Sequence, residues 1–147
     1  MIREKKIPTD IINKLPHLAK EVESLVYVNA LYFFGSLVKG GLKPLSDIDI
    51  AVLFMNSVSR KDREKLVLDL MGVVEEKLST SEFDLIELNS APLRFAYNVL
   101  KEGKLVFVKD KGELIDFREK TVKHYLDFNY YRRQLDKDLL ERIGFHG

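Results

Sequence analysis

Two aspartates stand at the start of an apolar, strand-like run at residues 47–54. Successive side chains of a strand point to opposite faces, so Asp47 and Asp49 share one face while Ile48 and Ile50 share the other. The run then continues with apolar residues only, which indicates a buried strand. Two carboxylates at the mouth of a buried strand repel each other and need compensation, which a bound divalent cation provides. The pattern therefore predicts a buried strand with a metal-binding end.

The rest of the chain alternates between helical and strand-like apolar patterns, which predicts a sheet covered by helices. Pro16 lies inside the first helical pattern and is expected to kink or split that helix. Helices are expected at 9–25, 57–78, 91–101 and 111–142, and strands at 30–34, 82–88 and 104–108 in addition to 47–54.

These elements indicate an α+β (mixed α/β) class, with a small mixed β-sheet and a long C-terminal helix. We expect a single domain over residues 1–147, with a core at about 28–110 and a helical extension at about 111–143. The pattern does not fix the order of the strands.

A Gly-Ser pair precedes the acidic strand by ten residues. Gly35 ends the strand at 30–34 and permits close approach of the backbone to a ligand. Ser36 opens a short helix that ends near 40–41, and the free N–H groups of a helix start bind anions. Lys39 lies one turn further along, where it fits a phosphate contact about as well as a solvated surface. A phosphate cradle beside an acidic pair predicts a site for a nucleoside triphosphate.

Asp84 is a third acid, isolated within the apolar strand at 82–88. If this strand neighbours the strand at 47–54, Asp84 completes a two-metal site. Magnesium is the expected metal, because it prefers carboxylate and phosphate oxygens. Two alternatives remain: Asp84 is only an acid at a strand edge, or Glu87, on the opposite face, takes its place.

Together, Gly35-Ser36, Asp47-x-Asp49 and Asp84 resemble the nucleotidyltransferase superfamily related to DNA polymerase beta. The surrounding residues resemble the small MNT (minimal nucleotidyltransferase) proteins more closely, over about residues 30 to 130. The resemblance implies a nucleotidyltransferase fold, ATP as substrate and two Mg²⁺ ions. One departure is Lys39, where relatives commonly have arginine. Lysine keeps the positive charge but lacks the bidentate hydrogen-bonding geometry of arginine. The implied metal-binding and catalytic residues are Asp47, Asp49 and Asp84, and the implied nucleotide-binding residues are Gly35, Ser36, Lys39 and Ser46.

MNT proteins of this type are implied to be antitoxins that transfer AMP to a tyrosine of a HEPN-domain toxin. In that reaction Asp84 would serve the acceptor side and act as its general base. One alternative is transfer to a small-molecule hydroxyl, which usually requires a larger second domain. Another is an antitoxin that neutralises its partner by binding alone.

Composition excludes several other classes of protein. The net charge of +1 gives no basic field, so direct binding of nucleic acid is not expected. The chain has no cysteine, which excludes disulfides and thiolate metal sites. The basic N-terminus lacks a following apolar core, and no apolar stretch is long enough to span a bilayer. We therefore expect a cytoplasmic protein without membrane contact; its oligomeric state is not predicted.

The three histidines, and the aromatic residues near the C-terminus, are interpreted mainly as structural residues. His17, His124 and His146 have no ligand spacing and are interpreted as surface or satisfied side chains. Arg118 and His124 form an R-x5-H pattern that resembles the active-site motif of HEPN ribonucleases, but a nuclease site is not favoured. The aromatic cluster is assigned mainly to core packing, with a partner interface as the alternative. Its members are Tyr125, Phe128, Tyr130 and Tyr131.

Overall fold

The computed structural model describes residues 9–35 and 48–144. Within these residues a sheet of four strands has the order β3-β2-β1-β4. The strands are β1 (Val28–Phe34), β2 (Ile48–Phe54), β3 (Phe83–Glu87) and β4 (Lys104–Val108). β1 pairs antiparallel with β2 and with β4, whereas β2 and β3 run parallel. This confirms the expected mixed sheet and makes β1 and β2 its central strands.

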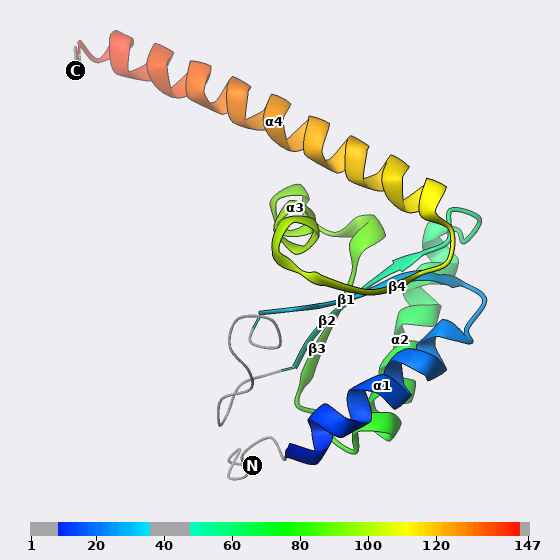
Figure 1. The fold of residues 1–147 in the computed structure, drawn as a ribbon. Helices are drawn as coiled ribbons and strands as arrows, with labels where there is room; N and C mark the ends of the chain where they lie inside the picture. The colour runs from blue at the N-terminus through cyan, green and yellow to red at the C-terminus, as the bar shows by residue number, and fades with distance from the viewer. Residues whose placement is uncertain (1–8, 36–47, 145–147) are drawn as a thin grey trace.

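Helices α1 (Thr9–Glu23) and α2 (Arg60–Leu78) cover one face of the sheet (Figure 1). Ser59 caps α2, because its hydroxyl accepts a hydrogen bond from the backbone N–H of Asp62 at 3.2 Å. The strands contribute every second residue to this apolar layer, which gives the alternation seen in β2. The fully buried members are Leu18, Val22, Val28, Leu31, Ile48, Ile50, Val52, Phe54, Leu70, Val74 and Leu78.

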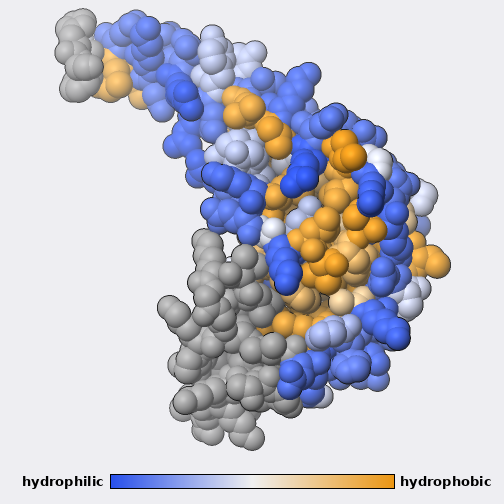
Figure 2. All heavy atoms as spheres, in the orientation of Figure 1, coloured by the Kyte–Doolittle hydropathy of each residue, from blue (hydrophilic) through white to orange (hydrophobic). Residues whose placement is uncertain are grey.

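The other face is covered by the short 3-10 helix η2 (Leu88–Ser90), by α3 (Leu93–Glu102) and by the first half of α4 (Lys111–Arg142). The buried side chains of this second layer are Ala30, Tyr32, Ala51, Leu53, Leu88, Ala96, Val99, Leu100 and Leu114. Figure 2 shows a broad apolar patch on the visible surface, where Figure 1 has the edge strand β4.

Asn29 fixes the start of α4 against the sheet. Its side chain is fully buried, donates from Nδ2 to the Asp110 carbonyl at 3.1 Å and accepts from the Asp110 N–H at 2.7 Å. Asp110 in turn caps α4, because its carboxylate accepts from the Glu113 N–H at 3.0 Å. One buried amide therefore sets the direction in which the 32-residue helix leaves the body.

The second half of α4 projects away from the body (Figure 1). Only Leu114 and Thr121 of this helix are buried, and every residue from Tyr130 to Arg142 is exposed. Tyr131 is 69% exposed and Phe128 is 56% exposed. The assignment of the aromatic cluster to core packing is therefore wrong for Phe128, Tyr130 and Tyr131. Tyr125 stacks on Tyr97 with ring centroids 3.8 Å apart, whereas Tyr130 and Tyr131 meet each other edge to face.

Pro16 does not split the first helix, because α1 is continuous from Thr9 to Glu23. Proline removes one N–H from the helical ladder, but Leu18 and Val22 remain buried against the sheet and hold the helix in place. The other predicted boundaries within the described residues agree with the structure to within a few residues, and α4 and β4 agree at both ends. The short helix predicted from Ser36 to about 40–41 lies outside the described residues. No helix in the described ranges is long and apolar enough to cross a membrane.

Candidate active site

Asp49 and Asp84 lie side by side across the parallel pair of β2 and β3. The two residues are direct partners in the strand register. Registered residues on parallel strands point to the same face, roughly 5 Å apart between strands. That face is the one covered by α3, because Asp49 lies on the same face of β2 as Ala51 and Leu53, which belong to the second apolar layer. Asp84 is exposed and Asp49 is half-buried, so solvent reaches the acidic pair.

Gly35 lies against Asp49 from the β1 side. β1 ends opposite β2 with Phe34 registered on Asp49, which brings Gly35 to the carboxylate. The backbone of Gly35 has φ +66, a region that favours glycine. A Cβ at this position would overlap Oδ2 of Asp49 and lie 3.0 Å from its Cγ. Position 35 therefore requires glycine for two reasons: its positive φ angle and the close approach of the Asp49 carboxylate.

An aromatic contact holds this end of β1 against α3. The rings of Phe34 and Phe95 meet edge to face, with centroids 5.6 Å apart and an interplanar angle of 86°. Phe34 immediately precedes Gly35, so this contact positions the turn beside Asp49. The sequence reasoning did not single out Phe95, because a phenylalanine in a helical pattern carries no sign of its partner.

Glu87 is excluded as a substitute for Asp84. It faces the α2 side of the sheet, where its Oε2 accepts from Nε of Arg63 at 3.3 Å. Both side chains of this ion pair are largely shielded from solvent, at 15% and 13% exposure. Glu87 therefore anchors α2 to β3 instead of joining the acidic pair.

Four of the predicted site residues lie outside the described residues: Ser36, Lys39, Ser46 and Asp47. Within the described ranges, no group of three His, Cys, Asp or Glu side chains is placed to hold a metal. The described part of the site consists of Asp49, Asp84 and Gly35. Two carboxylates on one open face supply hard oxygen ligands, which suit Mg²⁺.

Arg118 and His124 do not form a joint site. His124 lines a cavity of the second face, whereas Arg118 is absent from that lining.

Burial raises the pKa of the Tyr32 hydroxyl, and the nearby charge of Arg118 partly offsets this shift. Tyr125 behaves in the opposite way: its hydrogen bond with Asn129, together with the charges of Arg94 and Lys101, lowers its pKa.

Comparison with known proteins identifies relatives of this chain. The family model described as "Polymerase beta, Nucleotidyltransferase" matches residues 13–112. The chain is 26% identical to the protein adenylyltransferase MntA of Aphanizomenon flos-aquae over 94% of its own length and 92% of the relative. It is 27% identical to the protein adenylyltransferase MntA of Shewanella oneidensis, over 87% of this chain and 86% of that one.

Solved structures show the same fold. A toxin–antitoxin crystal structure with AMP-PNP superposes with a TM-score of 0.60 at 26% identity, covering 87% of this chain and 97% of that chain. A structure of a tri-AMPylated Shewanella oneidensis HEPN toxin in complex with MNT antitoxin gives a TM-score of 0.55 at 25% identity, covering 88% and 96%.

Proposed function

The chain belongs to the polymerase beta nucleotidyltransferase family, and on this premise we propose that it transfers AMP from ATP to a tyrosine of a HEPN-domain toxin and so acts as an antitoxin. One observation carries the proposal: Asp49 and Asp84 are registered partners on one accessible face, next to a glycine turn. The relatives named protein adenylyltransferase MntA and the complex with a tri-AMPylated HEPN toxin support the choice of reaction and acceptor.

The reaction is an in-line displacement at the α-phosphorus of ATP. The acceptor oxygen forms a bond to the α-phosphorus, the bond from that phosphorus to the bridging oxygen breaks, and pyrophosphate leaves. The tyrosine hydroxyl gives up its proton in this step. Asp84 is the more exposed of the two described acids, so we assign it to the acceptor side as the general base.

Asp49 has a different role. It is half-buried and its carboxylate lies close to Gly35, so it is less accessible to an acceptor than Asp84. Asp49 and Asp84, with Asp47, would hold Mg²⁺. The bound metal would neutralise the charge of the triphosphate and lower the pKa of the acceptor hydroxyl. Gly35, Ser36, Lys39 and Ser46 are assigned to the nucleotide, on the sequence pattern alone for the last three.

The projecting half of α4 is the proposed contact for the toxin. It carries exposed apolar side chains at Phe128, Tyr131, Leu135 and Leu139, which follow helical spacing along one side. Exposed apolar stripes of this kind mark interaction sites. α4 also packs on α3, the helix that reaches the acidic site through Phe95.

Incubation with Mg²⁺, labelled ATP and the product of the neighbouring gene, which the proposal requires to be a HEPN protein, tests the function. We expect label on a tyrosine of the HEPN protein, and a fall in its ribonuclease activity as label accumulates. Asp49→Asn and Asp84→Asn should each abolish labelling. Glu75→Gln is the matched control, because Glu75 is an exposed acid of α2, on the other face of the sheet.

The same variants separate catalysis from binding. If Asp49→Asn silences the HEPN protein as well as the parent does, without label, the chain neutralises its partner by contact and the proposed reaction is wrong. Asp84→Asn should retain much of the affinity for Mg²⁺–ATP while losing turnover. Equal loss of both would move Asp84 to the triphosphate side.

A further inference from the structure

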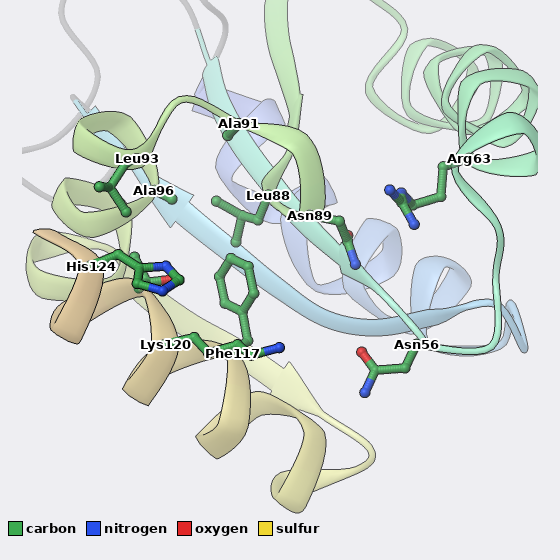
Figure 3. Close-up of a pocket in the computed structure, with 11 residues that line it drawn as sticks. Asn56, Arg63, Leu88, Asn89, Ala91, Leu93, Ala96, Phe117, Lys120 and His124 are labelled. Carbon is green, nitrogen blue, oxygen red and sulfur yellow. The ribbon is translucent and has the colours of Figure 1, made fainter.

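A cavity of about 380 Å³ lies beyond the end of β2 that is remote from the acids. Its walls come from η2, α3 and the first half of α4, together with Asn56 and Arg63 (Figure 3). Roughly 17 Å of strand separate Asp49 from Phe54 at about 3.3 Å per residue, and Asn56 lies further on. The lining contains none of Gly35, Asp49 and Asp84, so the cavity and the described acidic pair use separate side chains.

The lining of this cavity is cationic at its rim and apolar at its base. Among the described residues it contains the basic side chains of Arg63, Lys120 and His124 and no carboxylate. Leu88, Leu93 and Phe117 supply apolar surface. Figure 3 places Arg63 and Asn56 on one side of the Phe117 ring and His124 on the other.

Arg63 is held in position by three hydrogen bonds. Its Nε bonds to Glu87, Nη1 donates to the Val58 carbonyl at 3.0 Å, and Nη2 donates to the Ser90 hydroxyl at 3.2 Å. The guanidinium carries five N–H groups, so two remain for another acceptor. The pairing with Glu87 reduces its net charge, which leaves the principal positive charge of the cavity on α4.

One face of α4 presents to the cavity polar groups that have no partner among the described residues. Phe117, Lys120, Thr121 and His124 follow the spacing that brings residues to one side of a helix. Thr121 is only 6% exposed, and its hydroxyl has no hydrogen bond with any described side chain or backbone group. Lys120 and His124 likewise make no ion pair or hydrogen bond within the described residues. A buried hydroxyl without a partner is costly, and a bound acceptor would remove that cost.

We propose that this cavity binds a small organic anion that has a planar apolar body and a phosphate or carboxylate headgroup. This ligand is distinct from the nucleotide at the acidic pair. Its anionic oxygens accept hydrogen bonds from Lys120, Thr121 and His124. Its apolar body packs on Phe117, Leu88 and Leu93. This inference does not rest on the proposed transfer reaction, because none of these residues belongs to the acidic site.

Titration with phenyl phosphate and with benzoate, followed by amide NMR shifts of the full chain, tests the proposal. We expect saturable shifts confined to residues 88–96 and 117–124 for at least one of the two anions. The tighter of the two identifies the headgroup as phosphate or carboxylate. Benzyl alcohol, which has the ring without the charge, should bind at least tenfold more weakly. Equal binding of benzyl alcohol, or shifts centred on Asp49 and Asp84, would overturn the proposal.

Lys120→Gln should weaken the tighter anion about tenfold, as expected for loss of one charge-assisted hydrogen bond. Lys123→Gln is the matched control, since Lys123 is an exposed lysine of the same helix outside the lining. Equal weakening by both variants would reduce the effect to general electrostatics and contradict a built site.

Thr121→Val provides a readout that does not require a ligand. Because the hydroxyl is buried without a described partner, its removal should leave the melting temperature of the free protein unchanged or raised. The same variant should bind the anion more weakly. A lower melting temperature together with unchanged anion affinity would make the hydroxyl structural and refute its role.

Discussion

The contact between Gly35 and Asp49 makes position 35 sensitive to a single methyl group. A Cβ would overlap the carboxylate of Asp49, and φ +66 is strained for any other residue. Gly35→Ala should therefore lower the free energy of unfolding by about 1–3 kcal/mol, measured by urea denaturation, and displace Asp49. Gly72→Ala is the matched control, because a Cβ at Gly72 of α2 meets nothing within 4 Å. It should stabilise the protein by about 0.5–1 kcal/mol. A stable Gly35→Ala variant would show that the turn relaxes and that this contact is dispensable.

Tyr32 predicts how stability changes at alkaline pH. Burial raises the pKa of its hydroxyl above 10.0, and burial together with Asp69 does the same for Tyr27. A raised folded-state pKa contributes stability that is complete below the unfolded pKa and is lost as pH rises through the folded pKa. The free energy of unfolding should therefore fall above pH 10, and Tyr32→Phe should fall less steeply. Urea midpoints at pH 8 and above pH 10 measure this difference. Parallel curves for parent and variant would assign the loss to other groups.

At the residue scale, the sequence predicted the face on which Asp49 lies but not the contacts around it. Period-two alternation placed Asp49 on the face opposite Ile48 and Ile50, which both lie in the first apolar layer. The register of Asp49 with Asp84 meets the condition that their strands are neighbours. The ion pair of Glu87 with Arg63 and the ring contact of Phe34 with Phe95 were not predictable, because both join segments far apart in the chain. Asp47, Ser36, Lys39 and Ser46 stay predictions.

At the element scale, local patterns located the helices and strands well. Ser59 and Asp110 mark the starts of α2 and α4 through side-chain caps, which are local in sequence. Strand order was not predictable, because it depends on pairing over long separations. Pro16 shows the converse: a local helix breaker is tolerated where tertiary packing of Leu18 and Val22 supports the helix.

α4 shows where apolar periodicity fails as a guide to burial. The spacing of Phe128, Tyr131, Leu135 and Leu139 predicts an apolar face, and periodicity cannot tell a core from a partner. In the free chain this stripe meets solvent, because α4 has already left the sheet beyond Asn129. The missing information is the identity of the surface that covers it.

The exposed stripe of α4 predicts a variant that separates stability from partner binding. Leu135→Lys combined with Leu139→Lys should change the free energy of unfolding by less than about 0.5 kcal/mol, because both side chains are largely exposed. Affinity for the HEPN protein should fall about tenfold or more if the stripe is its contact. Calorimetry of the complex measures the affinity, and Lys137→Gln, on the other side of the helix, is the control. Unchanged affinity in the double variant would place the interface elsewhere.

At the scale of the whole molecule, β1 and β2 join two apolar layers and two functional regions. Both strands contribute alternate residues to each layer, so neither layer can form without the central pair. The acids lie where β2 begins and the cationic cavity lies beyond its end. α3 contacts both, through Phe95 at the first and Leu93 at the second. The fold therefore gives the two proposed sites separate sets of side chains.

This separation predicts that each ligand stabilises the molecule through its own site. A ligand bound only to the folded state stabilises it by about 2.7 kcal/mol at one hundred times its dissociation constant. Mg²⁺–ATP should raise the melting temperature of the parent, and a chelator should reverse most of the rise. Asp49→Asn should lose the response to Mg²⁺–ATP and keep the response to the cavity's anion, whereas Lys120→Gln should keep the response to Mg²⁺–ATP and reduce the response to the anion. Thermal unfolding of both variants with each ligand measures the four responses. If Lys120→Gln also loses the response to Mg²⁺–ATP, the nucleotide occupies the cavity and the two sites are one.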